Sequence, residues 1–122
     1  MPETDVVFFA TDEGDSPALS WMDGLASKVQ DKLIVRVERL KECGHELRRP
    51  EADYLRDGIY ELRVRFQSVH YRLLYFFNGK QAVISHGCTK ESEVPAGEID
   101  RAAKNKELFE NDPPGHTYKE PE

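Results

Sequence analysis

The feature that most constrains the fold is a hairpin signal, Asn78-Gly79, between two runs rich in β-branched and aromatic residues. Both residues tolerate the positive φ that a two-residue hairpin turn requires. A third run of the same character precedes this pair. The pattern therefore predicts three consecutive antiparallel strands, at residues 59–66, 69–77 and 81–86.

Helical periodicity lies on both sides of these strands. Ser16-Pro17 is typical of a helix start, because serine caps free N–H groups and proline fits the first helical position. Apolar residues then recur at helical spacing as far as Leu40, interrupted at Asp23-Gly24. Pro95 opens a similar pattern near the end of the chain. We predict helices at residues 16–23, 25–43 and 96–110.

The remaining segments complete one domain, expected at residues 1–110. Residues 6–10 form a short apolar run that predicts a first strand, and residues 45–57 read as a connecting loop. Residues 111–122 are polar and proline-rich, so we expect a disordered tail. The predicted fold is α+β, with two N-terminal helices packed on a curved, mainly antiparallel four-stranded sheet and a C-terminal helix. We expect the helices to cover one face of the sheet, in two layers.

Charge is unevenly distributed along the chain. The 122 residues carry a net charge of −6, which argues against broad, charge-driven RNA affinity. The segment 58–90 nevertheless has a single acid, Glu61, and this pattern indicates a local anion site. Its basic residues are Arg63, Arg65, Arg72, Lys80 and Lys90.

Several classes of protein are disfavoured. Cys43 and Cys88 form no CxxC motif, so neither a disulfide framework nor a cysteine zinc site is indicated. Zinc, P-loop, Rossmann and serine-triad spacings are absent, and we expect no cofactor. The first residues do not resemble a signal peptide and no apolar run has the length of a membrane span, so we expect a cytoplasmic protein.

The strand alternation places arginines on one face. If the link 67–68 is a two-residue turn, Arg63 lies directly opposite Arg72. With a two-residue turn at 78–79 as well, Arg72 lies opposite Ser85. Like charges in such positions destabilise a sheet, but two guanidinium groups suit a phosphate. The alternative is that Glu61 forms an ordinary surface salt bridge with one of the arginines.

Sequence runs in this order are found in one known family. They are DGIYELRV at 57–64, YRLLYFF at 71–77 and SHGCTK at 85–90, followed by Pro95 and Glu98-Ile99. Together they resemble the phage-derived HigB/RelE-like toxin family, over roughly residues 5–111. The resemblance implies a compact α+β fold and a small toxin of a bacterial type II toxin–antitoxin pair. It also implies inhibition by a neighbouring antitoxin, often a helix-turn-helix protein. Better-studied branches cut mRNA on the ribosome without a metal ion, and this implies an mRNA interferase that inhibits translation.

The resemblance and the strand alternation together give candidate site residues. The family's basic sheet positions fall on Arg63 and Arg72, with Lys90 after the last strand. Metal-free RNA cleavage needs a base, a cationic group for the phosphate and an acid. The arginines fit the cationic role, Lys90 adds charge or transfers a proton, and His70 is the best histidine for proton transfer.

Other residues have secondary roles. Arg65 and Ser85 share the arginine face as substrate-binding candidates, and Glu61 there orients an arginine. His86 falls on the opposite face, where a hydrogen-bonded core histidine competes with a substrate contact. His116 and Tyr118 either fold over the site or stay disordered.

Two functions remain open from the sequence. The first is an endoribonuclease toxin that uses Arg63 and Arg72 for the phosphate. The second is a non-catalytic module that binds RNA or an antitoxin. A DNA-contacting regulator is a weaker reading, because no predicted helix carries clustered basic residues. The edge of the strand at 6–10, or the long helical pair, are the candidate antitoxin surfaces.

Overall fold

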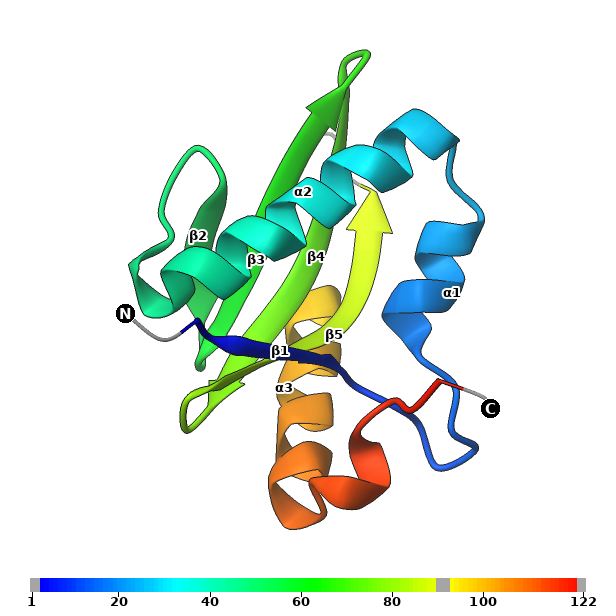
Figure 1. Ribbon diagram of the computed structural model, residues 1–122, viewed down its shortest axis with the longest axis vertical. Coiled ribbons are helices and arrows are strands. Elements are labelled where there is room, and N and C mark those ends of the chain that lie inside the picture. Colours follow the sequence, from blue (N-terminus) through cyan, green and yellow to red (C-terminus); the bar gives the residue numbers. More distant parts are fainter. Residues whose placement is uncertain (1–2, 90–92, 121–122) are drawn as a thin grey trace.

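The computed structural model describes residues 3–89 and 93–120, and it contains one five-stranded mixed sheet with helices on both faces (Figure 1). The strands lie in the order β1-β5-β4-β3-β2, with β1 parallel to β5 and the other pairs antiparallel. The strands are β1 (Asp5–Phe8), β2 (Ala52–Arg56), β3 (Ile59–Phe66), β4 (Val69–Asn78) and β5 (Gln81–Thr89). The helices are α1 (Pro17–Asp23), α2 (Ser27–Cys43) and α3 (Ala96–Asn111), with short 3₁₀ turns at Gly44–Glu46 and Pro114–His116. The α+β class is confirmed, but the four-stranded sheet was wrong.

The three helices form where the periodicity predicts them. The Ser16 side chain accepts a hydrogen bond from the Leu19 amide at 3.2 Å, and Pro17 occupies the first turn of α1. Gly24 ends that helix, and the chain then re-enters a helix at Ser27. The apolar stripe of α2 is buried against the sheet, because its members recur on one side of the helix. These residues are Val29, Leu33, Val37 and Leu40.

The helices do not all lie on one face, so the two-layer prediction was wrong. Helices α1 and α2 pack with Leu62, Leu73 and Tyr75 on one face of the sheet. Helix α3 lies on the other face, where it packs against Leu74 and Phe76 (Figure 1). Because β4 is apolar on both of its faces at this point, each face requires a covering layer. The side chains that α3 contributes are Ile99, Ala102 and Phe109.

The segment predicted as a loop contains the edge strand β2. It pairs with β3 so that Asp53 lies opposite Glu61. The connecting residues Asp57 and Gly58 both have positive φ, 55° and 81°, as a tight hairpin turn requires. Asp-Gly is itself a hairpin signal, and it was present in the sequence. The β2–β3 hairpin was therefore recognisable from this dipeptide.

The C-terminal segment is ordered as far as it is described, so the prediction of a disordered tail was wrong. Its histidine, His116, is buried, stacks on Phe9 with ring centroids 5.2 Å apart, and places Nδ1 2.8 Å from the Ala10 carbonyl. The Tyr118 amide donates to the Phe8 carbonyl at 2.8 Å. The segment thus lies along the end of β1 and away from the arginines of β3 and β4.

None of the described helices has both the length and the apolar character that crossing a membrane would need.

Candidate functional site

Arg63 and Arg72 form a cross-strand pair on β3 and β4, as predicted. The pairing follows from the turn at Gln67 and Ser68, whose φ angles of 50° and 68° are typical of a two-residue hairpin. The Arg63 amide donates to the Glu51 carbonyl on the opposite side of β3. Arg63 and Arg72 are therefore a non-hydrogen-bonded pair, the arrangement in which side chains approach most closely, with Cα atoms about 4.5 Å apart.

One carboxylate lies between the two guanidinium groups. Glu61 Oε1 is 3.2 Å from Arg63 Nε, and Glu61 Oε2 is 3.7 Å from Arg72 Nη1. Glu61 and Arg72 are 4% and 6% exposed, whereas the Arg63 side chain is more accessible. Two positive charges thus share one negative charge, and the alternative of a salt bridge with Glu61 is present for both arginines.

Arg72 is incompletely satisfied. Its Nε is buried, and no described residue accepts a hydrogen bond from it. A buried N–H of a charged group without an acceptor costs free energy, typically 1–3 kcal/mol or somewhat more. Burial also raises the pKa of Glu61 above its usual value, while Arg72 and Arg63 act in the opposite direction. The buried Arg72 guanidinium and the buried Glu61 carboxylate are therefore both in energetically unfavourable environments, as is common for charged groups at functional sites.

These residues line an open cleft of about 560 Å³ between the sheet and the start of α3. Its lining includes side chains of β3 and β4 and three apolar residues, Leu55, Val94 and Ile99. The sequence analysis did not single out these apolar residues, because Leu55 lies in β2 and the other two lie just before α3 and in its first turn. The charged residues that line the cleft are Arg49, Arg56, Arg63 and Arg72 with Asp53, Glu61 and Glu93.

The arginines at the rim are already paired. Arg49 lies 2.7 Å from Asp53, and this hydrogen-bonded ion pair holds the pKa of the Asp53 carboxyl below its usual value. Arg56 contacts both Asp57 and Asp100, at 2.6 and 2.8 Å. The acids at the rim therefore offset its arginines, and the positive charge of the cleft lies with Arg63 and Arg72.

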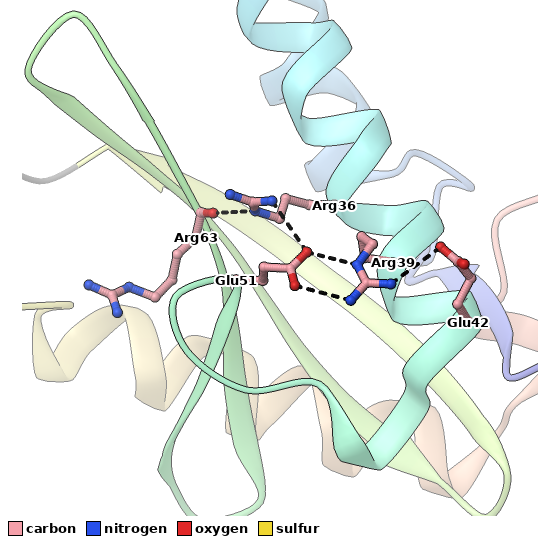
Figure 2. A network of polar contacts seen from close by, with 5 residues as sticks. All are labelled: Arg36, Arg39, Glu42, Glu51 and Arg63. Carbon is pink, nitrogen blue, oxygen red and sulfur yellow. Dashed lines mark hydrogen bonds and ion pairs between the residues drawn. The ribbon is translucent and has the colours of Figure 1, made fainter.

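A second polar network holds the backbone of Arg63 in place. Arg36 Nε donates to the Arg63 carbonyl at 2.7 Å, and Arg36 and Arg39 both contact Glu51 (Figure 2). The hydrogen bond from Arg39 lowers the pKa of Glu51, so this carboxylate stays charged. Figure 2 shows the Arg63 side chain extending away from the network, which leaves its guanidinium to the cleft.

Ser85 does not extend the arginine row, so this prediction was wrong. The turn residues are Gly79 and Lys80, because Asn78 already pairs with Gln81, and a bulge follows between Leu74 and Tyr75. The two shifts place Arg72 opposite Cys88 instead of Ser85.

The bulge also turns His86 to the face covered by α3, contrary to the prediction. His86 lies opposite Leu74 and is 1% exposed. Ser85 Oγ is 2.8 Å from His86 Nδ1 and accepts from Asn105, while His86 Nε2 is 3.3 Å from Glu98 without hydrogen-bond alignment. Burial lowers the pKa of His86 to about 4; Arg101 adds to this effect and Glu98 opposes it. The contacts run from a serine to a histidine to a glutamate, as in a serine triad. Ser85 and His86 are buried, however, so this cluster links β5 to α3 inside the protein.

The remaining candidates are divided between the cleft and its surroundings. His70, the histidine proposed for proton transfer, lines the cleft together with Arg63 and Arg72. Arg65 is exposed on β3, and it lines two neighbouring hollows rather than the cleft. Lys90 lies outside the described residues. Within residues 3–89 and 93–120, no group of three or more histidine, cysteine, aspartate or glutamate side chains is arranged to hold a metal ion.

Comparison with known proteins gave one result that bears on this site. No curated protein matches the chain. A family model described as "Phage derived protein Gp49-like (DUF891)" matches residues 20–107, which include α2, all of β2 to β5 and most of α3. The match therefore contains Glu61, Arg63, His70 and Arg72, the residues brought together at the cleft. On this evidence the chain belongs to the Gp49-like family of phage-derived proteins.

Proposed function

We propose that this protein is the toxin of a toxin–antitoxin pair and cleaves RNA at the cleft below α3, without a metal ion. Membership of the Gp49-like family and the resemblance to HigB/RelE-like toxins support the general role. One observation carries the reaction: Arg63 and Arg72 are adjacent on neighbouring strands, with one carboxylate between them, in a cleft open to solvent. Two guanidinium groups on neighbouring strands suit the oxygens of one phosphodiester.

The side chains present can supply each step of such a cleavage. Glu61 accepts the proton of the ribose 2′-hydroxyl while the 2′ oxygen attacks the phosphorus. A buried carboxylate with a raised pKa is a stronger base than an exposed one. Arg63 and Arg72 stabilise the negative charge of the pentacoordinate phosphate. The bond to the 5′ oxygen then breaks, and His70, in its protonated form, donates a proton to that oxygen. The products are a 2′,3′-cyclic phosphate and a 5′-hydroxyl end.

In this proposal Glu61 has a larger role than orienting an arginine. Its two oxygens already contact the groups that would bind the phosphate, at 3.2 and 3.7 Å. A 2′-hydroxyl next to that phosphate would therefore lie near the same carboxylate. His70 lines the same cleft, so the acid and the base can act on one phosphodiester.

A second function is favoured by a specific observation. Arg72 is only 6% exposed, and both arginines are already engaged by Glu61, which suits a structural ion cluster as well as a phosphate site. In that case the protein is a non-catalytic module that binds RNA or an antitoxin. An antitoxin partner and an association with the ribosome are part of the first proposal and are compatible with the second.

Induced expression and cleavage in vitro separate the two functions. The wild type should arrest growth and cut single-stranded RNA to fragments with cyclic phosphate ends, and RNA with 2′-deoxyribose at the cleavage site should stay intact. Arg63→Gln should abolish both effects, because Arg63 is the more accessible of the two cleft arginines. Lys80→Gln is the matched control, since Lys80 is an exposed cation in the β4–β5 turn. Normal growth and intact RNA with a folded wild type would support the non-catalytic module.

A further inference from the structure

Strand β3 is longer than the edge strand that covers it. Strand β2 pairs with β3 only from Ile59 to Leu62, and the Glu51 carbonyl adds one hydrogen bond to the Arg63 amide. The Arg63 carbonyl accepts from Arg36 Nε at 2.7 Å. Beyond this point, no strand among the described residues pairs with residues 64–66 on that side.

The uncovered part presents backbone groups in a known direction. In an antiparallel strand, the N–H and C=O of alternate residues point to the same side. Because both groups of Arg63 point away from β4, those of Arg65 do so as well. Arg65 therefore offers one donor and one acceptor at an open edge, which is the arrangement that an added strand uses.

The edge is flanked by a hollow on each side. The first, about 280 Å³, lies toward α2 and is lined by Lys32, Val35 and Val64, among others. The second, about 270 Å³, reaches Arg63 and His70, which also line the cleft. Both hollows share Arg36, Val64 and Arg65, so they form one track along the edge.

The two sides of this track differ in chemistry. On the α2 side, the apolar residues of the hollow are Val64 and Val35, and Val35 is 56% exposed. The other residues that line it, Asp31, Lys32, Arg36 and Arg65, are charged. An exposed aliphatic side chain beside an open strand edge is a contact that a side chain of an added strand can use. On the opposite side the hollow is cationic, with Arg36, Arg63 and Arg65. Arg65 forms no ion pair with the described carboxylates at salt-bridge distance.

We propose that this edge binds an extended segment of a partner protein in which apolar and acidic residues alternate. Pairing with the Arg65 backbone would continue the sheet beyond β3. Alternation would then direct apolar side chains, opposite Val64 and Phe66, toward α2, and an acidic one, opposite Arg65, toward the cationic hollow. A segment bound here would lie beside the cleft, but its binding does not depend on nuclease activity.

A peptide-binding experiment tests this proposal. The probe is a short fluorescein-labelled peptide of alternating valine and glutamate, and its affinity is measured by anisotropy. Arg65→Pro and Arg65→Ala both lack the guanidinium, but only the proline variant lacks the outward N–H. Proline is tolerated where the N–H of an edge strand faces solvent. We expect Arg65→Pro to bind the peptide roughly tenfold more weakly than Arg65→Ala.

Val35→Asp provides a test that does not disturb the strand, because Val35 is exposed on α2. Val35→Asp should weaken peptide binding by at least roughly tenfold, whereas Lys80→Asp should not. RNA cleavage by Val35→Asp should equal that of the wild type. A peptide with lysine in place of glutamate should not bind.

Three results would overturn the proposal. They are equal binding by the Arg65→Pro and Arg65→Ala variants, equal binding of the lysine peptide, and absence of binding by the wild type. If single-stranded RNA binds instead, in a manner sensitive to Val35→Asp, the track belongs to nucleic acid. If the protein forms dimers that Arg65→Pro disrupts, the occupant is a second copy of the chain.

Discussion

Glu61 on β3 contacts Arg72 diagonally across the β3–β4 pair, with a carboxylate oxygen 3.7 Å from a guanidinium nitrogen, and both side chains are almost fully buried. Burial opposes the charged form of each group, whereas their proximity favours it. The charge of the cleft therefore depends on Glu61, which also contacts Arg63. A change at this one carboxylate should affect RNA affinity, cleavage and stability in different ways.

Replacing Glu61 with glutamine should separate binding from cleavage. The substitution removes the negative charge shared by two arginines, so RNA should bind more tightly to Glu61→Gln than to the wild type. Cleavage should fall by about 10²-fold or more, because the proton acceptor is lost. Single-turnover cleavage and fluorescence anisotropy with 2′-deoxy-substituted RNA measure the two effects. Glu93→Gln, at an exposed acid of the same cleft, is the control and should change neither by much.

The pH dependence of cleavage provides a further check on the same residue. Because burial raises the pKa of Glu61, the wild-type rate should increase with pH above the usual range of a glutamate. If binding and cleavage both increase in Glu61→Gln, the carboxylate only neutralises the arginines, and another group is the base.

Arg72→Met should destabilise the fold far more than Arg65→Met. Removing Arg72 leaves the buried Glu61 with Arg63 as its remaining ion-pair partner, and breaking a buried pair in this way costs about 3 kcal/mol. Arg65 is exposed on the neighbouring strand β3, so its replacement should change the free energy of unfolding by less than about 0.5 kcal/mol. Urea denaturation of the two variants measures the difference. Equal stabilities would show that the pair does not contribute to folding.

His86 should make the protein less stable in mild acid. Its pKa is lowered from about 6.5 to about 4 by burial, so the folded state holds it neutral while the unfolded state takes up a proton in this range. The free energy of unfolding should therefore decrease as the pH falls from about 6.5 to about 4. Glu61, whose pKa is raised, acts in the opposite direction, since its protonated form is favoured in the folded state.

The contribution of His86 is isolated by comparing the wild type with His86→Gln. The variant should lose the acid-dependent part of the slope, whereas Glu61 contributes equally to both proteins. Urea denaturation between pH 4 and pH 7 is the measurement. Identical slopes would mean that His86 takes up its proton equally in the folded and unfolded states, and the surrounding Ser85, Asn105, Glu98 and Arg101 cluster would then have no role in its pKa.

Gly87 and Gly97 form a matched pair for testing the packing of α1 on β5. A Cβ added at Gly87 would lie 2.1 Å from the Trp21 ring, so Gly87→Ala should shift α1 and destabilise the fold by about 1–3 kcal/mol. A Cβ at Gly97 would have nothing within 4 Å. Gly97→Ala, within α3, should therefore be neutral or stabilising by up to about 1 kcal/mol. Thermal melts of both variants test this, and an unaffected Gly87→Ala would show that Trp21 moves freely.

The sequence alone determined the elements with strong local signals. The caps and the apolar periodicity placed α1, α2 and α3 within a few residues, because helix formation depends on nearby residues. The pairing of Arg63 with Arg72 was predicted on the condition that the link at Gln67 and Ser68 is a two-residue turn; the structure meets this condition, and a short hairpin then fixes its own register. The Asp57-Gly58 dipeptide is an equally local signal for the β2–β3 hairpin, although residues 45–57 were predicted as a loop.

The tertiary structure decided what depends on residues distant in the chain. The bulge in the β4–β5 pair moved Ser85 out of the arginine row and turned His86 toward α3. The side of the sheet that α3 covers, and the position of His116 on Phe9, follow from the competition of apolar surfaces for burial. Above all, the burial of Glu61 between two arginines arises only when β3, β4 and the start of α3 enclose it, because desolvation is a property of the whole environment of a charge and not of its neighbours in sequence.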